Sequence, residues 1–151
     1  MHADVRIRGT VGITREVRDT LEMLRLKNAN SCALVQENPT SKGMLNLVKD
    51  WITYGEIDKN TLVEMLKKRM RLKGNKRVDE NALKEIGIDS FDALADGLMN
   101  GKIKFKDIKN VQPFFRLTPP SKGFKSTREN YPQGDLGHRG KEINALLVRM
   151  I

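Results

Sequence analysis

The sequence has 151 residues and a formal net charge of +9, from 28 lysines and arginines against 19 aspartates and glutamates. A chain of this length can bury a core of its own, and its excess of basic residues predicts a polyanionic partner. Its uncharged apolar runs are far shorter than the ~20 residues of a membrane helix, and early charged residues argue against a secretory signal. We therefore expect a cytoplasmic protein without a membrane segment.

Residues 1–57 alternate between patterns typical of strands and of helices, and predict the order β-α-β-α-β. In the first predicted strand, alternate residues are apolar: Ala3, Val5 and Ile7. The residues between them are polar or charged: His2, Asp4, Arg6 and Arg8. One face of the sheet is therefore expected to be solvent-exposed and positive.

The remaining elements of this region follow from caps and apolar spacing. Thr14 is a suitable N-cap for a helix that ends near residues 28–30, and its apolar stripe consists of Val17, Leu21 and Leu24. Residues 32–35 and 52–54 predict two more strands. Pro39 starts a second helix, whose expected core-facing stripe consists of Met44, Leu47, Val48 and Trp51.

Residues 58–110 predict a helical insertion. Three N-cap residues precede apolar helical patterns in this segment: Asp58, Asp79 and Ser90. Gly87 and Gly101 stand where helix C-caps are expected. Residues 102–110 fit either a strand or an irregular turn that packs on the helices.

Residues 111–151 form the third predicted segment. Residues 111–117 read as an extended edge strand, because Pro113 cannot donate to a sheet ladder. A long loop follows over residues 119–140, and the chain closes with a helix whose apolar positions are Ile143, Leu146, Leu147 and Met150.

Two basic segments are candidate contacts with a nucleic-acid backbone. The first contains Lys67, Lys68, Arg69, Arg71, Lys73, Lys76 and Arg77. The second lies in and just after the long loop and contains Lys122, Lys125, Arg128, His138, Arg139 and Lys141, interleaved with Phe124 and Tyr131. The alternatives are a solvated helix end for the first and a disordered linker for the second. We expect the loop to be mobile in the free protein and ordered on RNA.

Further candidate RNA contacts lie in residues 1–57: Arg6, Arg8, Arg15, Lys42 and Lys49. Arg15 follows a short turn, residues 9–14, that leads into a helix N-terminus where an anion could bind. This turn does not contain a known phosphate-binding motif.

Catalytic, cofactor and metal sites are not expected. Cys32 is the only cysteine and is predicted to be an inert core residue. His2 and His138 lie at opposite ends of the chain, without metal-ligand spacing. Acidic residues at helical spacing, namely Asp89, Asp92 and Asp96, are expected on a solvated helix face.

Several short segments resemble a known family. They are Val5-Arg6-Ile7-Arg8-Gly9, Asp19-Thr20-Leu21-Glu22-Met23-Leu24, Lys42-Gly43-Met44-Leu45, Tyr54-Gly55-Glu56 and residues 115–124. In this order they resemble the universal large-subunit ribosomal protein family uL30, in its longer archaeal form. Lys42 stands where that family usually has arginine, which keeps the charge but loses the bidentate fork.

The resemblance implies an α+β, ferredoxin-like split β-α-β core, with helices on one face of a small antiparallel sheet, over residues 1–57. It also implies a helical insertion over residues 58–110 and a C-terminal extension over residues 111–151, with an edge strand, a basic RNA-contacting loop and a helix. The expected partners are 23S-type ribosomal RNA near the 5S rRNA docking region and neighbouring ribosomal proteins, around a single copy of the chain.

Two alternatives remain open at the level of sequence. An acylphosphatase-like enzyme would share the small basic fold, but Ile13 and Thr14 stand where its phosphate loop needs an aromatic-arginine pair. A generic RNA-binding module outside the ribosome would require stacking aromatics, which make up only 5% of the chain. Neither alternative explains the last forty residues.

Overall fold

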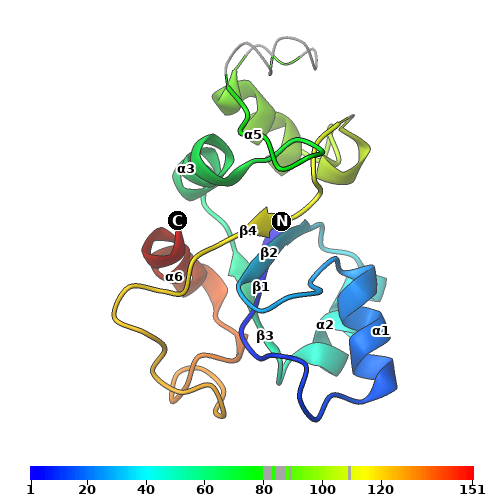
Figure 1. The fold of residues 1–151 in the computed structure, drawn as a ribbon, viewed down its shortest axis with the longest axis vertical. Helices are drawn as coiled ribbons and strands as arrows, with labels where there is room; N and C mark the ends of the chain where they lie inside the picture. The colour runs from blue at the N-terminus through cyan, green and yellow to red at the C-terminus, as the bar shows by residue number, and fades with distance from the viewer. Residues whose placement is uncertain (80–82, 84–87, 89, 109) are drawn as a thin grey trace.

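The computed structural model describes the whole chain except residues 80–82, 84–87, 89 and 109. A single sheet lies at its centre, with helices on both faces (Figure 1). The predicted helix after Asp79 and its cap at Gly87 fall largely outside the described residues. None of the helices in the described part of the chain is long and apolar enough for a bilayer crossing.

The sheet has five strands in the order β4-β2-β1-β3-β5. The central strand, β1 (His2–Arg6), pairs antiparallel with β2 (Ser31–Val35) and with β3 (Ile52–Glu56). The C-terminal segment supplies both edges. β4 (Phe115–Arg116) pairs antiparallel with β2, and β5 (Gly137–His138) pairs parallel with β3. The predicted loop of residues 119–140 therefore contains a strand of the sheet.

One face of the sheet is covered by α1 (Arg15–Met23) and α2 (Pro39–Val48). Their buried apolar side chains pack with those of the sheet in one cluster, which consists of Leu21, Leu24, Leu26, Ala33, Leu45, Val48 and Ile52. This arrangement confirms the predicted β-α-β-α-β order. The first helix ends earlier than predicted, at Met23, because Arg25 adopts a positive φ of 62° that a helix cannot accommodate.

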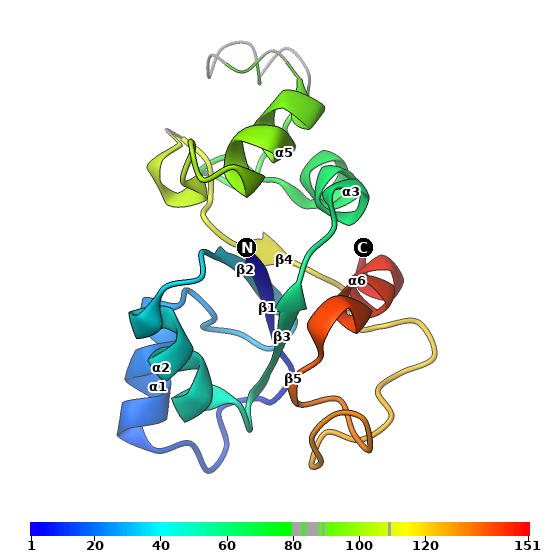
Figure 2. The same cartoon turned by 180° about the vertical axis from the view of Figure 1, so that it is seen from behind.

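Helices from the later segments pack on the other side of the sheet and beyond its end marked N (Figure 2). They are α3 (Lys59–Arg69), α5 (Phe91–Met99) and α6 (Ile143–Met150). The larger apolar cluster contains residues from the first strand, the insertion and the extension, including Val5, Leu66, Leu94, Phe115 and Leu147. The strands and helices agree with the expected α+β, ferredoxin-like fold.

The expectation of a solvent-exposed, positive sheet face is wrong. His2 is 8% exposed, Asp4 0% and Arg6 2%. Asp4 pairs in register with Ala33, which belongs to the cluster beneath α1 and α2. The alternating pattern of the strand is therefore correct, but both of its faces are covered by helices.

The expected stripe of the second helix is also partly wrong. Leu45 and Val48 are buried, at 2% and 0% exposure, whereas Leu47 is 47% exposed. Met44 and Trp51 are half-buried and pack against the same cluster. The helix is rotated from the predicted orientation, so that Leu45 rather than Leu47 faces the sheet.

Residues 102–110 adopt the irregular-turn alternative rather than a strand, as far as they are described. A short 3-10 helix, η1 (Phe105–Asp107), places Phe105 against Phe115 with the two rings stacked at 4.9 Å between centroids. The caps predicted at Thr14, Asp58 and Ser90 all stand at helix N-termini, and the Ser90 hydroxyl accepts a hydrogen bond from the backbone N–H of Ala93.

Candidate nucleic-acid interface

Most of the side chains expected to contact RNA lie at the surface. The exposed ones are Arg15, Lys42, Lys49, Lys67, Lys68, Lys73, Lys76, Arg77, Lys122, Lys125, Arg128, His138 and Lys141. Three are half-buried, namely Arg8, Arg69 and Arg71. Arg6 and Arg139 are buried and offer RNA almost no surface.

Arg6 supports a loop within the protein. Its guanidinium donates hydrogen bonds of 2.6–2.9 Å to the backbone carbonyl oxygens of Arg8, Gly9, Leu26 and Lys27. These four acceptors belong to the connections that follow β1 and α1. The charge of Arg6 is therefore used to hold two backbone segments together, and its role as an RNA contact stays a prediction that its burial does not favour.

Arg8 lies at the end of the sheet where β1 leaves it, beside the turn between α2 and β3. Its guanidinium carbon is 4.5 Å from the centroid of the Trp51 ring, and its Nη1 donates to the carbonyl oxygen of Asp50 at 3.2 Å. Cation–π stacking of this kind positions an arginine while its remaining N–H groups stay available. Lys49 is exposed in the same turn.

The turn between β1 and α1 lies beside this pair. Val11, within it, is 91% exposed, and Gly12 has a positive φ of 73°. Arg15 is exposed over 86% of its side chain, and its Nε lies 3.7 Å from Asp19 Oδ2, one helical turn along α1. The arrangement gives a flexible cation at a helix N-terminus, which suits a phosphate contact.

The basic segment of residues 67–77 spans the end of α3 and a tight turn. Leu72 and Lys76 are joined by a backbone hydrogen bond of 2.9 Å, and the turn between them uses positive φ at Gly74 and Asn75. Lys73, Lys76 and Arg77 are exposed around this turn. The segment therefore presents a compact cationic tip rather than a continuous helical face.

Two members of this segment have partners within the protein. Arg69 donates from Nε and Nη2 to the carbonyl oxygen of Ile151, at 3.1 and 2.7 Å, which ties α3 to the end of α6. Lys68 lies 2.6 Å from the carboxylate of Glu64 on the same helix. For Lys68 and Arg69, the alternative interpretation of this segment as a helix end is therefore the better one. It fits the exposed cations of the turn that follows less well.

The long loop is organised around a buried carboxylate. Asp135 is 3% exposed and accepts hydrogen bonds from the backbone N–H groups of Lys125 and Ser126 and from the guanidinium of Arg139. The guanidinium of Arg139 is buried in this pair, and its role as an RNA contact stays a prediction that its burial does not favour. Leu136, at 1% exposure, anchors the loop to the core.

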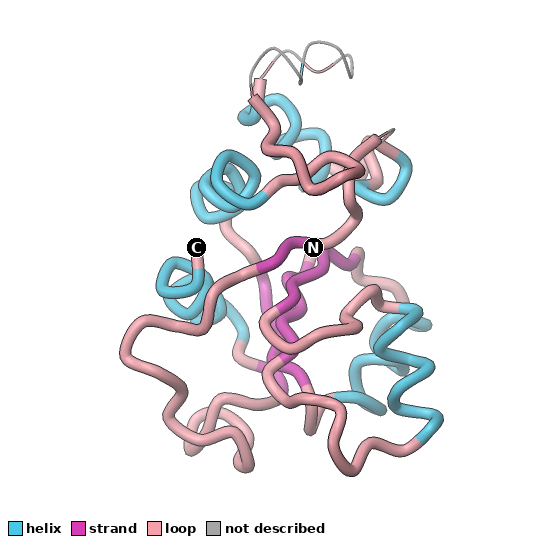
Figure 3. The backbone as a smooth tube through the Cα atoms, in the orientation of Figure 1, coloured by secondary structure: helices cyan, strands magenta, loops and turns pink. Residues whose placement is uncertain are grey.

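The rest of this loop runs along the outside of the molecule between β4 and β5 (Figure 3). Lys122, Lys125, Arg128 and Lys141 are exposed along or just after it, and the Nζ of Lys125 donates to the carbonyl oxygen of Pro132 at 3.1 Å. The backbone is thus folded back on itself while the cationic side chains stay at the surface.

His138 lies on β5, beside β3. Its ring centroid is 5.4 Å from that of Tyr54 and 6.4 Å from that of His2. The two histidines, far apart in the sequence, are therefore neighbours in space.

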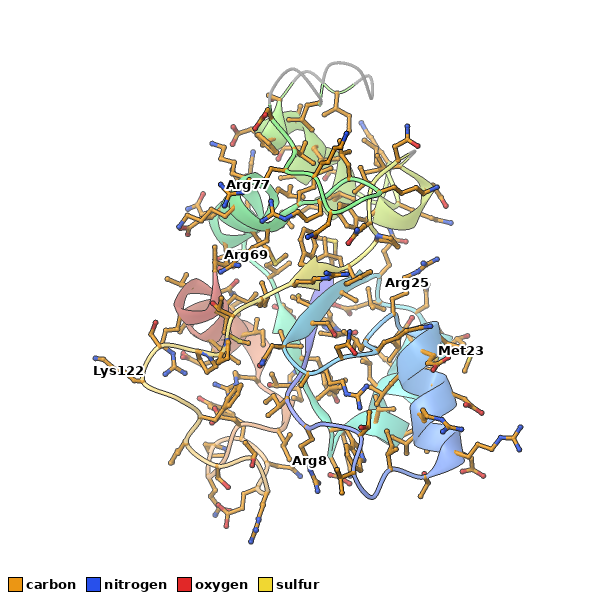
Figure 4. The ribbon with its side chains drawn as sticks, in the orientation of Figure 1. Arg8, Met23, Arg25, Arg69, Arg77 and Lys122 are labelled. Carbon is orange, nitrogen blue, oxygen red and sulfur yellow. The ribbon has the colours of Figure 1, made fainter. Side chains whose placement is uncertain are left out.

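The candidate residues do not form one compact patch (Figure 4). Arg77 and Arg69 lie in the upper half of the view, Lys122 projects outward from the long loop, and Arg8 lies at the lower end. An RNA that contacts all of them must follow the length of the protein.

Several exposed cations were not among the contacts predicted from the sequence, and Arg116 and Arg25 are two of them. Arg116 lies on the edge strand β4, 5.7 Å from the centroid of the Phe114 ring, and Arg25 lies in the turn after α1. Both are isolated in the sequence, so a search for basic runs does not find them. A basic residue close to a half-buried aromatic at the start of an edge strand is the signal that could have identified Arg116.

Comparisons with known proteins agree with the expectation that the exposed basic surface binds ribosomal RNA. The sequence profile of the family described as Ribosomal protein L30p/L7e matches residues 5–52. The chain is 42% identical to an Archaeoglobus fulgidus protein over 99% of both chains. It is 46% identical to a Thermoplasma volcanium protein over 100% of this chain and 93% of the relative. A Methanococcus vannielii protein is 45% identical over 99% of both chains. All three relatives are named Large ribosomal subunit protein uL30.

The chain belongs to the uL30 family. The relatives match it along nearly its whole length, so the insertion and the extension are family features as well as the core. This confirms the resemblance seen in the short segments of the sequence. The family consists of structural ribosomal proteins, and the acylphosphatase-like alternative is therefore set aside.

Proposed function

We propose that the chain is a structural constituent of the large ribosomal subunit that binds and stabilises 23S-type ribosomal RNA. The proposal depends on one observation about this uL30-family chain. Its exposed basic side chains lie mainly on the loops and turns between helices and strands, and in the described part of the chain most of them have no acidic partner. Among the exposed candidates that the structure describes, only Arg15 and Lys68 have a carboxylate oxygen within 4.0 Å. Unpaired lysines and arginines on loops can neutralise phosphates without first breaking an internal ion pair.

Three groups of basic side chains would contact the RNA. The end of the sheet offers Arg8, held by Trp51, together with Lys49. The turn after α3 offers Lys73, Lys76 and Arg77, and the long loop offers a further set beginning at Lys122. Their separation favours a protein that clamps folded RNA segments together over one that reads a single strand.

The proposal also covers the position of the protein on the ribosome and the molecules that it contacts there. Family membership supports a cytoplasmic, ribosome-bound protein present as a single copy, in contact with ribosomal RNA and with neighbouring ribosomal proteins. A position close to the 5S rRNA docking region is part of this proposal.

Sedimentation of a cell lysate tests the function. The protein should migrate with the large subunit on a sucrose gradient and stay there through a moderate-salt wash, because many phosphate contacts must be broken together. Recovery in the soluble fraction at low salt would contradict the proposal. Binding of purified ribosomal RNA without co-sedimentation would favour the RNA-binding module outside the ribosome.

A further inference from the structure

One histidine and two glutamates, which are residue types that can ligate a metal ion, meet at the end of the central strand opposite Arg8. His2 is the first residue of β1 and pairs across the sheet with Glu56, the last residue of β3. Glu37 lies just beyond β2, on the other side of β1. The antiparallel sheet therefore brings the three side chains together at the end of the sheet marked N in Figure 1.

The distances are close to those of a coordination shell. The Nε2 of His2 lies 3.0 Å from Glu37 Oε1. One ligand atom from each of His2, Glu37 and Glu56 can be chosen so that all three lie within 4.8 Å of one another. Ligand atoms at about 2.0 to 2.2 Å from a tetrahedral Zn²⁺ are about 3.3 to 3.6 Å apart. Small rotations of the two exposed glutamate side chains would bring the three donors to this spacing.

The donor types and their surroundings also suit a metal ion. One imidazole nitrogen and two carboxylate oxygens form a ligand set for divalent transition metals. The His2 side chain is only 10% exposed, so its ring is held by packing, whereas that of Glu37 is 42% exposed and can adjust.

Little positive charge within the protein balances the Glu37 carboxylate. Glu37 Oε1 lies 3.8 Å from the N-terminal ammonium, and with His2 neutral this is its only cationic partner in the described part of the chain. An exposed ion pair of this length contributes little and is screened by salt. A divalent cation between Glu37 and Glu56 would neutralise both carboxylates at once.

We propose that His2, Glu37 and Glu56 bind one divalent transition-metal ion, best Zn²⁺, with water completing the coordination. The bound ion would join the ends of β1 and β3 to the segment that follows β2. The sequence does not predict this site, because the three residues are far apart and form no ligand motif.

Titration calorimetry with Zn²⁺ and the untagged, full-length chain tests the proposal. We expect saturable binding of one equivalent. His2→Gln, Glu37→Gln and Glu56→Gln should each weaken binding by at least about tenfold, as loss of a metal ligand or of its immediate support does. The two glutamate variants change exposed side chains, and circular dichroism will verify that they stay folded.

Two control variants keep the proposal falsifiable. His138→Gln removes the other histidine, whose ring lies 6.4 Å from that of His2, and Glu64→Gln removes an exposed carboxylate on α3. Both should bind Zn²⁺ as the unmodified chain does. Absence of saturable binding, unchanged affinity in the three ligand variants, or a loss in His138→Gln as large as that in His2→Gln would each overturn the three-residue site.

Discussion

Asp4 is a charged residue type in an apolar setting. Its side chain is 0% exposed, and among the described residues neither carboxyl oxygen has a hydrogen-bond partner. Burial raises the pKa of Asp4 from 3.8 to about 8, because a low-dielectric interior disfavours the ionised form. The carboxyl group is therefore protonated at neutral pH in the folded protein.

This shift predicts how stability depends on pH. The unfolded chain releases the Asp4 proton near pH 4 and the folded chain near pH 8, so the Asp4 contribution to stability falls as pH rises between these values. The fall should be up to about 1.4 kcal/mol per pH unit. Asp4→Asn should remove this component, measured as denaturant midpoints at pH 5, 6.5 and 8. Asp50→Asn, at an exposed position, serves as the control, and the same pH dependence in all three proteins would contradict the assignment.

At the scale of single elements, the orientation of α2 is decided by packing. The helix places Leu45 against the sheet and leaves Leu47 at the surface, although both are leucines two positions apart. Residues two apart on a helix point in different directions, so only one of them can occupy the core.

The two leucines provide a direct test of this orientation. Leu45→Ala should lower the free energy of unfolding by about 2 to 5 kcal/mol, because it leaves a cavity beneath the sheet. Leu47→Ala should cost less than about 1 kcal/mol, since the side chain is already half in water. Chemical denaturation of the two variants measures both values, and a larger loss for Leu47→Ala would reverse the assignment of the helix face.

Strand β3 approaches η2 (Gly140–Glu142) so closely that it tolerates no side chain at one position. A Cβ added at Gly55 would collide with the backbone carbonyl of Gly140. In contrast, a Cβ at Gly43, within α2, would meet no atom within 4 Å. The close approach of η2 therefore requires glycine at position 55, whereas nothing packed against position 43 requires it there.

These positions predict opposite effects of the same substitution. Gly55→Ala should destabilise the protein by about 1 to 3 kcal/mol, because the backbone must shift to remove the collision. Gly43→Ala should stabilise it by about 0.5 to 1 kcal/mol, since alanine favours a helix interior over glycine. Thermal unfolding of both variants checks the prediction, which fails if Gly55→Ala unfolds at the same temperature as the unmodified chain.

At the scale of the whole molecule, the last forty residues complete the fold as well as the proposed interface. They provide both edge strands and α6, and their long loop carries exposed cations beyond its buried anchors at Asp135 and Leu136. Mobility of this loop in the free protein remains a prediction. The anchors would limit such movement to the outer part of the loop, where Lys122 and Arg128 are exposed.

The loop predicts a defined salt dependence of RNA binding. Its exposed cations are Lys122, Lys125, Arg128 and Lys141. If each neutralises one phosphate, replacing all four with alanine should flatten the slope of log K against log salt by roughly 3 to 4 units. Filter binding to ribosomal RNA over a salt series measures the slope, and circular dichroism verifies the fold.

A matched control uses Arg18 and Lys59, which already lie within 4 Å of Asp19 and Asp96. Their replacement with alanine should change the slope far less. An unchanged slope in the loop variant would assign the phosphate contacts to the turn after α3 and reduce the loop to a linker.

Much of the local structure could be predicted from the sequence alone. The order of strands and helices over residues 1–57, the caps at Thr14, Asp58 and Ser90, and the closing helix all depend on neighbouring residues. Caps and apolar periodicity act over one or two turns, so their signals stand within a short window of sequence. The net charge and the basic segments likewise indicated a polyanionic partner.

Tertiary structure alone decided which polar residues face water and which meet one another. Arg6 and Arg139 look like surface cations in the sequence, yet they bond buried backbone and a buried carboxylate. His2 and His138 become neighbours because β5 pairs with β3 beside β1. Burial and proximity of this kind depend on how distant elements pack, and strand pairing joins residues that no local pattern connects.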